Sequence, residues 1–131
     1  MTDGTAVPQA PCRILVVDDD AGVRESVQKV LREAGYESLA AADGAEALER
    51  LKLRKVDLLL LDLGLPAKNG WVLLGQVQHA YPRLPVIVIT GQTNQQSAAY
   101  ESGARLLMEK PLDAQRLLDT IQKVLAEPAE V

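Results

Sequence analysis

Carboxylates stand where hydrophobic runs of this chain end. Asp18 and Asp19 follow residues 13–17, and Asp62 follows residues 58–61. Open parallel sheets keep their reactive groups at the carboxyl ends of the strands. If the two runs are neighbouring strands, the three carboxylates form one cluster. Such a cluster would hold a hard divalent cation and expose one carboxylate as a phosphoryl acceptor.

Two more polar residues stand at the ends of later runs. Thr90 closes residues 85–90, and Lys110 with Pro111 follows residues 105–108. A hydroxyl and an ammonium group on either side of the carboxylates would stabilise a phosphoryl group during transfer. Thr90 alone would be an ordinary β-branched strand residue and Lys110 alone a solvated lysine. Their positions in the chain are what favour a chemical role.

The hydrophobic pattern alternates between strand and helix. Unbroken aliphatic runs are typical of strands covered on both faces, and apolar residues at helical spacing separate these runs. Asp20 and Asp113 stand where helix N-caps are expected, and Gly35 stands where a C-terminal cap is expected. This alternation implies a parallel sheet between two helical layers. We predict strands at 13–17, 36–42, 56–61, 85–90 and 105–108, and helices after residue 20, after residue 43, after the loop 64–70, over 94–102 and after residue 113.

Composition predicts one domain with an aliphatic core. A chain of 131 residues is too short for two ordinary domains. Hydrophobic residues make up 47% and charged residues 24%, which is an ordinary globular balance. Phe is absent, and there are only one Trp and three Tyr. The core must therefore consist mainly of Leu, Val, Ile and Ala.

Charge and terminal sequences exclude several classes of function. The net charge is −4 with scattered Lys and Arg, so no basic stripe predicts nucleic-acid binding. No apolar run approaches the roughly 20 residues of a membrane span, and the N-terminus does not resemble a signal peptide. Cys12, the single cysteine, suits a reducing compartment, so we expect a cytoplasmic protein. Residues 1–12 and 127–131 are expected to be flexible tails.

The motifs together resemble the receiver domain of bacterial two-component response regulators. The resemblance covers residues 13–126 and implies a flavodoxin-like α/β fold. That fold is a five-stranded parallel sheet of order 2-1-3-4-5 flanked by five helices. The resemblance rests on Val16-Val-Asp-Asp19, Asp57-Leu-x-x-x-Asp62-x-x-Leu-Pro66-x-x-x-Gly70, Val88-Ile-Thr90-Gly91 and Lys110-Pro111.

The resemblance implies that Asp62 accepts a phosphoryl group from a sensor histidine kinase or a phosphotransfer protein. Asp18, Asp19, Asp62 and the backbone carbonyl of Gly64 would bind Mg²⁺, for which Mn²⁺ could substitute. Thr90 and Lys110 would contact phosphoryl oxygens. The protein would assist its own phosphorylation and dephosphorylation without being an enzyme in the usual sense.

Other family features bear on how the phosphorylated state would act. Pro111 would fix the turn after the last strand. Leu107 stands where most members carry an aromatic switch residue, and the segment 90–103 is about two residues shorter than usual. Gly64 and Gln92 occupy the two positions that influence the phosphate lifetime. We therefore expect activation to alter the face around the helix predicted over 94–102 differently from typical receivers.

Alternatives to a stand-alone regulator remain open at this point. A chain without room for an output domain after residue 126 could dock to a protein target, relay phosphate as an intermediate, or be a receiver excised from a larger regulator or hybrid kinase. Met1 favours a natural N-terminus. We expect a monomer or weak homodimer whose downstream target is unknown.

The sequence gives less support to two rival classes of protein. A small phosphohydrolase with Asp62 as nucleophile would need a second Asp where Gly64 stands. A nucleotide- or flavin-binding module would need a glycine-rich loop after the first strand, where three aspartates stand instead.

Overall fold

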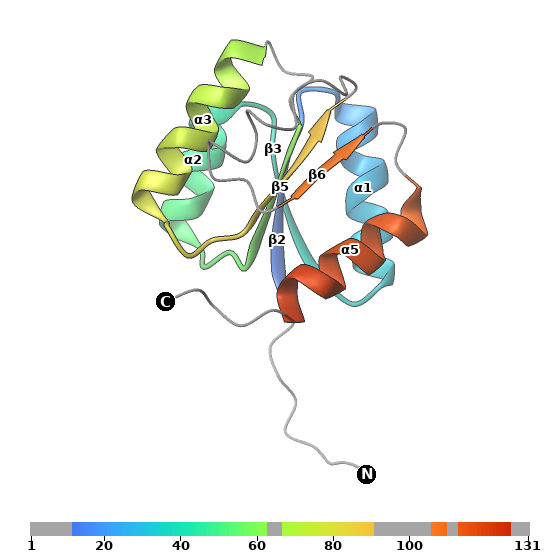
Figure 1. Ribbon diagram of the computed structural model, residues 1–131. Helices are drawn as coiled ribbons and strands as arrows, with labels where there is room; N and C mark the ends of the chain where they lie inside the picture. Colours follow the sequence, from blue (N-terminus) through green and yellow to red (C-terminus); the bar gives the residue numbers. More distant parts are fainter. Residues whose placement is uncertain (1–11, 63–66, 91–105, 110–112, 127–131) are drawn as a thin grey trace.

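The computed structural model describes residues 12–62, 67–90, 106–109 and 113–126, and its strands form one parallel sheet (Figure 1). The order across the sheet is β3-β2-β4-β5-β6, so the first strand of the chain lies inside the sheet. Numbered along the chain this is the order 2-1-3-4-5, and the predicted five-stranded parallel sheet is confirmed. The strands are β2 (Arg13–Val17), β3 (Glu37–Ala41), β4 (Leu58–Asp62), β5 (Val86–Thr90) and β6 (Leu106–Glu109).

The described helices cover both faces of the sheet. Figure 1 shows α2 and α3 on one side and α1 and α5 on the other. The helix predicted over 94–102 lies outside the described residues. Nowhere in the described part of the chain is a helix long and apolar enough to cross a membrane. The helices are α1 (Ala21–Glu33), α2 (Gly44–Leu53), α3 (Ala67–Ala80) and α5 (Ala114–Ala126).

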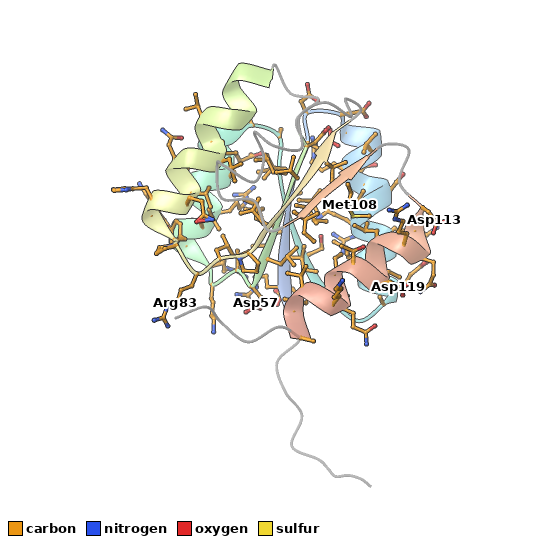
Figure 2. The ribbon with its side chains drawn as sticks, viewed as in Figure 1. Asp57, Arg83, Met108, Asp113 and Asp119 are labelled. Atoms are coloured by element: carbon orange, nitrogen blue, oxygen red, sulfur yellow. The ribbon has the colours of Figure 1, made fainter. Side chains whose placement is uncertain are left out.

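Strands β2, β4 and β5 each contribute to two separate cores, because successive side chains of a strand point to opposite faces of the sheet. In β2, Leu15 and Val17 pack with side chains of α2 and α3, whereas Ile14 and Val16 pack with those of α1 and α5. Met108 of β6 belongs to the α1–α5 side (Figure 2). The same alternation in β4 buries all of residues 58–61, which explains why the strand is an unbroken leucine run.

Aspartates cap two of the helices as predicted. The carboxylate of Asp20 accepts hydrogen bonds from the N–H groups of Gly22 at 2.9 Å and Val23 at 3.1 Å, at the start of α1. Asp113 accepts from the N–H of Arg116 at 2.8 Å, at the start of α5. The first cap bears on the functional site, because it makes Asp20 a structural residue beside Asp18 and Asp19.

Gly35 ends α1 in the conformation that its position predicts. Its φ is +96°, a left-handed value that glycine adopts without a steric penalty. Its N–H donates to the carbonyl of Arg32 at 3.0 Å, and the N–H of Tyr36 donates to the carbonyl of Leu31 at 3.0 Å. This pair of bonds is the Schellman arrangement, and it turns the chain from α1 into β3.

Helix α3 begins earlier than the sequence predicts. Residues 64–70 were expected to form a loop, yet α3 starts at Ala67. The buried side chains of Leu73, Leu74 and Val77 pack α3 against the sheet. That packing outweighs the cost of about 1 kcal/mol that glycine imposes inside a helix, so tertiary contacts override local propensity here.

Strand β4 also differs from its predicted limits, 56–61, because it runs from Leu58 to Asp62. The side-chain carboxylate of Asp57 accepts the N–H of Arg13 at 2.8 Å, so a side chain replaces a ladder bond at this position. Asp57 lies at the end of the sheet where the strands begin (Figure 2). At the other end, Asp62 is the last residue of the strand itself. The remaining strand limits agree with prediction to within one residue.

Candidate functional site

The register of the sheet places Asp18 beside Asp62. Val17 of β2 pairs with Leu61 of β4, and both strands run in the same direction. The next residues along the two strands are Asp18 and Asp62, at the carboxyl edge of the sheet. Neighbouring strands lie about 4.8 Å apart, so this register brings the two side chains to one place. The reason is topological, since β2 and β4 become neighbours only through the crossover order of the sheet.

Three carboxylates meet at this edge. One oxygen from each of Asp18, Asp19 and Asp62 lies within 4.8 Å of the other two. Asp18 and Asp62 are buried, with 4% and 3% of their surface exposed, whereas Asp19 is exposed. The predicted proximity of the three aspartates is therefore observed.

The carboxylate cluster fits a hard divalent cation. Ligands of octahedral Mg²⁺ at about 2.1 Å lie roughly 3 to 4 Å from one another. The oxygens of the cluster need to move by less than about 1 Å to reach that spacing. Two buried carboxylates and an exposed one also leave a side open to water or to a substrate oxygen. The donor set, which is oxygen alone, is the one that Mg²⁺ prefers over softer ligands.

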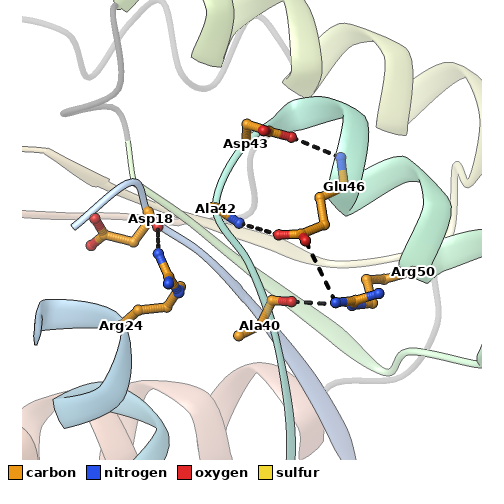
Figure 3. Close-up of polar contacts among 7 residues, drawn as sticks. All are labelled: Asp18, Arg24, Ala40, Ala42, Asp43, Glu46 and Arg50. Carbon is orange, nitrogen blue, oxygen red and sulfur yellow. Dashed lines mark hydrogen bonds and ion pairs between the residues drawn. The ribbon is translucent and has the colours of Figure 1, made fainter. Parts of the chain in front are cut away.

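Hydrogen bonds hold Asp18 in place. Its N–H donates to the carbonyl of Ala41 at 3.1 Å, which extends the pairing of β2 with β3 by one residue. Its side-chain Oδ1 accepts the N–H of Asp20 at 2.9 Å. Its carbonyl oxygen accepts a hydrogen bond from Nη1 of Arg24, on α1, at 2.8 Å (Figure 3). Backbone and side chain are thus both restrained.

The loop between β3 and α2 is fixed beside the site (Figure 3). Asp43 caps α2 by accepting the N–H of Glu46 at 2.8 Å, and Glu46 accepts the N–H of Ala42 at 2.7 Å. Nε of Arg50 donates to the carbonyl of Ala40 at 3.2 Å, and its guanidinium lies 3.7 Å from the Glu46 carboxylate. Because Ala41 lies between these anchored residues, the carbonyl that supports Asp18 is itself well placed.

The other predicted site residues are only partly described. Ile89 of β5 pairs with Asp62, so the backbone of Thr90 lies one position further along the neighbouring strand. The side chain of Thr90 lies outside what the structure describes, as do Gly64, Lys110 and Pro111. Their roles stay predictions. Leu107 lies in β6 by its backbone, and its side chain is likewise outside the described part.

One residue at this edge escaped the sequence analysis. Arg24 contacts the backbone of Asp18, yet it was counted only among the scattered basic residues. A signal was available, because Arg24 lies one helical turn after the cap Asp20 and its side chain can reach back over the preceding loop. A search for carboxylate motifs does not consider how an arginine side chain can reach back over the loop before its helix.

Comparison with protein families decides the identity of the fold and site. The family model described as the response regulator receiver domain matches residues 14–122, which is most of the chain. The chain belongs to the response regulator receiver domain family. This receiver domain is therefore a member of the phosphoacceptor proteins of two-component signalling, and the family resemblance is confirmed.

Relatives of this receiver domain include full-length regulators. It is 33% identical over 119 residues to the DNA-binding transcriptional regulator NtrC of Escherichia coli K12, covering 89% of this chain and 25% of NtrC. It is 34% identical over 117 residues to the response regulator MprA of Mycobacterium sp. strain KMS, covering 88% of this chain and 51% of MprA. The chain thus spans between a quarter and a half of the length of these relatives.

Solved structures of separate receiver domains match over nearly their whole length. The receiver domain of NtrX from Brucella abortus is 34% identical, with a TM-score of 0.82 and coverage of 88% of this chain and 99% of that one. The chemotaxis protein CheY4 of Vibrio cholerae is 31% identical, with a TM-score of 0.83 and the same coverage. The flavodoxin-like fold is therefore confirmed as well. Receiver domains generally bind Mg²⁺ at an acidic pocket, which is the kind of cluster seen here.

Proposed function

We propose that this receiver domain accepts a phosphoryl group on the carboxylate of Asp62, with the three-aspartate cluster as its Mg²⁺ site. The observation that carries the proposal is the position of Asp62, buried at the end of β4 within 4.8 Å of Asp18 and Asp19. A buried carboxylate beside two others is suited to bind a cation and to accept a phosphoryl group. Three carboxylates this close to one another repel, and a bound cation would relieve that repulsion.

The transfer step follows from the chemistry of the two groups. A carboxylate oxygen of Asp62 attacks the phosphorus of a phosphohistidine, the new O–P bond forms, and the P–N bond breaks. The imidazole of the donor leaves and takes up a proton from solvent. Both reactants are negatively charged, so positioning and charge neutralisation are what the protein must supply.

The residues around Asp62 are proposed to supply this positioning and charge neutralisation together. Bound Mg²⁺ would neutralise charge on the carboxylate and on the transferred phosphoryl oxygens. Asp18 and Asp19 hold the cation with Asp62, and the carbonyl of Gly64 is the fourth proposed ligand. Thr90 and Lys110 are proposed to donate to the phosphoryl oxygens, as the resemblance implies.

The partners follow from the class of reaction. The phosphoryl donor is proposed to be a sensor histidine kinase or a phosphotransfer protein, and the phosphorylated protein is proposed to act by docking to a protein target. The domain is proposed to span residues 13–126. The curated relatives NtrC and MprA are longer than this chain, so a role as one part of a larger regulator is proposed beside a role as a stand-alone domain.

Intact-protein mass spectrometry tests the proposal. Purified protein is incubated with acetyl phosphate, with and without Mg²⁺, as the wild type, Asp62→Asn and Asp119→Asn. Asp119 is an exposed residue of α5, so its variant matches the charge change of Asp62→Asn away from the site. We expect a Mg²⁺-dependent gain of one phosphoryl group in the wild type and in Asp119→Asn, and none in Asp62→Asn. Equal phosphorylation of Asp62→Asn would refute the assignment.

A further inference from the structure

We infer that Arg24 is a positioning residue for the acidic site and sets its affinity for Mg²⁺. The inference rests on the proposed function, since it concerns the same cluster. Its starting observation is the hydrogen bond from Nη1 of Arg24 to the carbonyl oxygen of Asp18, at 2.8 Å (Figure 3). Arg24 itself is half-buried on α1.

The contact acts on the peptide plane between Asp18 and Asp19. A peptide group is planar, so a hydrogen bond to the Asp18 carbonyl restrains the whole unit up to the Cα of Asp19. The following peptide plane is restrained as well, because the N–H of Asp20 donates to Oδ1 of Asp18 at 2.9 Å. Asp19 therefore lies between two anchored planes, and only the first depends on Arg24.

This anchoring matters most for Asp19. Asp62 is buried as the last residue of β4, and Asp18 is buried with its N–H bonded to Ala41 of β3, whereas Asp19 is exposed and lies one residue further from β2. Its carboxylate can remain within 4.8 Å of the other two only if the backbone that carries it stays in place. Arg24 supplies a restraint from a second element, since it reaches this loop from α1.

A positioning role and a simple charge effect predict opposite results. Arg24 carries a positive charge near a cation site, so by charge alone its removal would tighten Mg²⁺ binding a few-fold. If Arg24 instead holds the Asp18–Asp19 peptide in place, its removal weakens binding. Outer-shell partners of metal ligands contribute about tenfold or more to metal affinity, which exceeds the charge effect. The sign of the change therefore separates the two.

Isothermal titration calorimetry with MgCl₂ tests the inference on four proteins: the wild type, Arg24→Met, Arg24→Lys and Arg32→Ala. Met keeps the length of the stem and removes both the charge and the donors, while Lys keeps the charge and a donor. Arg32→Ala removes a charge from an exposed position on the same helix. We expect about tenfold weaker binding for Arg24→Met, recovery of most of that loss in Arg24→Lys, and no weakening for Arg32→Ala.

A kinetic measurement separates positioning from a general structural defect. The initial rate of phosphorylation by acetyl phosphate should fall in Arg24→Met at limiting Mg²⁺ and recover at saturating Mg²⁺. A rate that stays low at saturation overturns the inference. If circular dichroism shows that Arg24→Met does not fold, Arg24→Gln replaces it, because its shorter neutral side chain also loses the anchor.

The outcomes distinguish this inference from the function on which it rests. Wild-type protein that binds no Mg²⁺ would overturn both. Wild-type binding together with unchanged or tighter binding by Arg24→Met overturns the positioning role alone and leaves Asp62 as the proposed acceptor.

Discussion

Asp19→Asn should stabilise the protein in the absence of divalent cations. Asp18, Asp19 and Asp62 place three carboxylate oxygens within 4.8 Å of one another, so the folded state contains more mutual repulsion than the unfolded chain, in which only the sequence neighbours Asp18 and Asp19 stay close. Asn has nearly the shape of Asp but no charge. The substitution removes the two repulsive pairs in which Asp19 takes part and leaves the pair between Asp18 and Asp62.

The size of this effect follows from the spacing of the carboxylates. Two unit charges 4.8 Å apart repel by about 0.9 kcal/mol in water and about 3.5 kcal/mol at an effective dielectric constant of about 20. Asp19 is exposed, so the value in water is the more appropriate one, and two pairs give about 1–2 kcal/mol. For a domain of this size that corresponds to a rise in Tm of roughly 4–8 °C.

Urea unfolding followed by circular dichroism, in EDTA and in MgCl₂, measures the effect. In EDTA the free energy of unfolding of Asp19→Asn should exceed that of the wild type. At ten times its dissociation constant Mg²⁺ should stabilise the wild type by about 1.4 kcal/mol, and Asp19→Asn by clearly less. The gap between the two proteins should therefore narrow in Mg²⁺.

The control is Asp119→Asn, which removes a carboxylate from the exposed surface of α5. Its stability should stay within about 0.5 kcal/mol of the wild type in both solutions. An Asp19→Asn protein that is no more stable than the wild type in EDTA would show that the three carboxylates do not repel one another appreciably, and the electrostatic reasoning about the site would be wrong.

Two further predictions concern the turn that joins α1 to β3. Gly35→Ala should lower the free energy of unfolding by about 1–2 kcal/mol, because Gly35 has a φ of +96° and a methyl group there would meet no atom within 4 Å, so backbone strain is the whole effect. Unchanged stability in urea would contradict this. Burial, and secondarily the charge of Cys12, raises the pKa of Tyr36 above its usual 10.0. The stability from this raised pKa is present below the unfolded-state pKa of about 10 and is lost as pH rises through the higher folded-state value. Wild-type stability should thus fall more steeply above about pH 10 than that of Tyr36→Phe, and equal slopes would count against a raised pKa.

The fold could be predicted in outline because its elements repeat one physical pattern. The run of leucines at 58–61 is hydrophobic on both faces, as expected of a strand that is covered on both sides. The helices between the strands show clear apolar stripes. The caps Asp20 and Gly35 were predicted by local rules that depend on few neighbours. Short-range chemistry therefore determined both ends of α1.

Errors arose where distant residues decide the outcome. The start of α3 at Ala67 depends on packing of Leu73, Leu74 and Val77 against the sheet, which local propensity does not contain. The start of β4 depends on the side chain of Asp57 bonding to the backbone of a residue far away in sequence.

The site shows the same division. Aspartates at strand ends predicted the cluster of Asp18, Asp19 and Asp62, because the family resemblance implied a strand order in which the two strands that carry them are neighbours. The contact of Arg24 with Asp18 depends on the path of one side chain across a loop, and no rule of strand order contains it.

The interior position of β2 has a consequence for how the chain folds as it is synthesised. Residues 13–17 form the strand on which β3 and β4 pair from opposite sides, and both of those strands are complete by residue 62. All three carboxylates of the described cluster therefore emerge from the ribosome before β5 and β6 do. Their repulsion opposes the docking of β4 at its last residue before β5 and β6 have emerged from the ribosome. The nascent chain thus meets the repulsion of the cluster before β5 and β6 can pack beside β4.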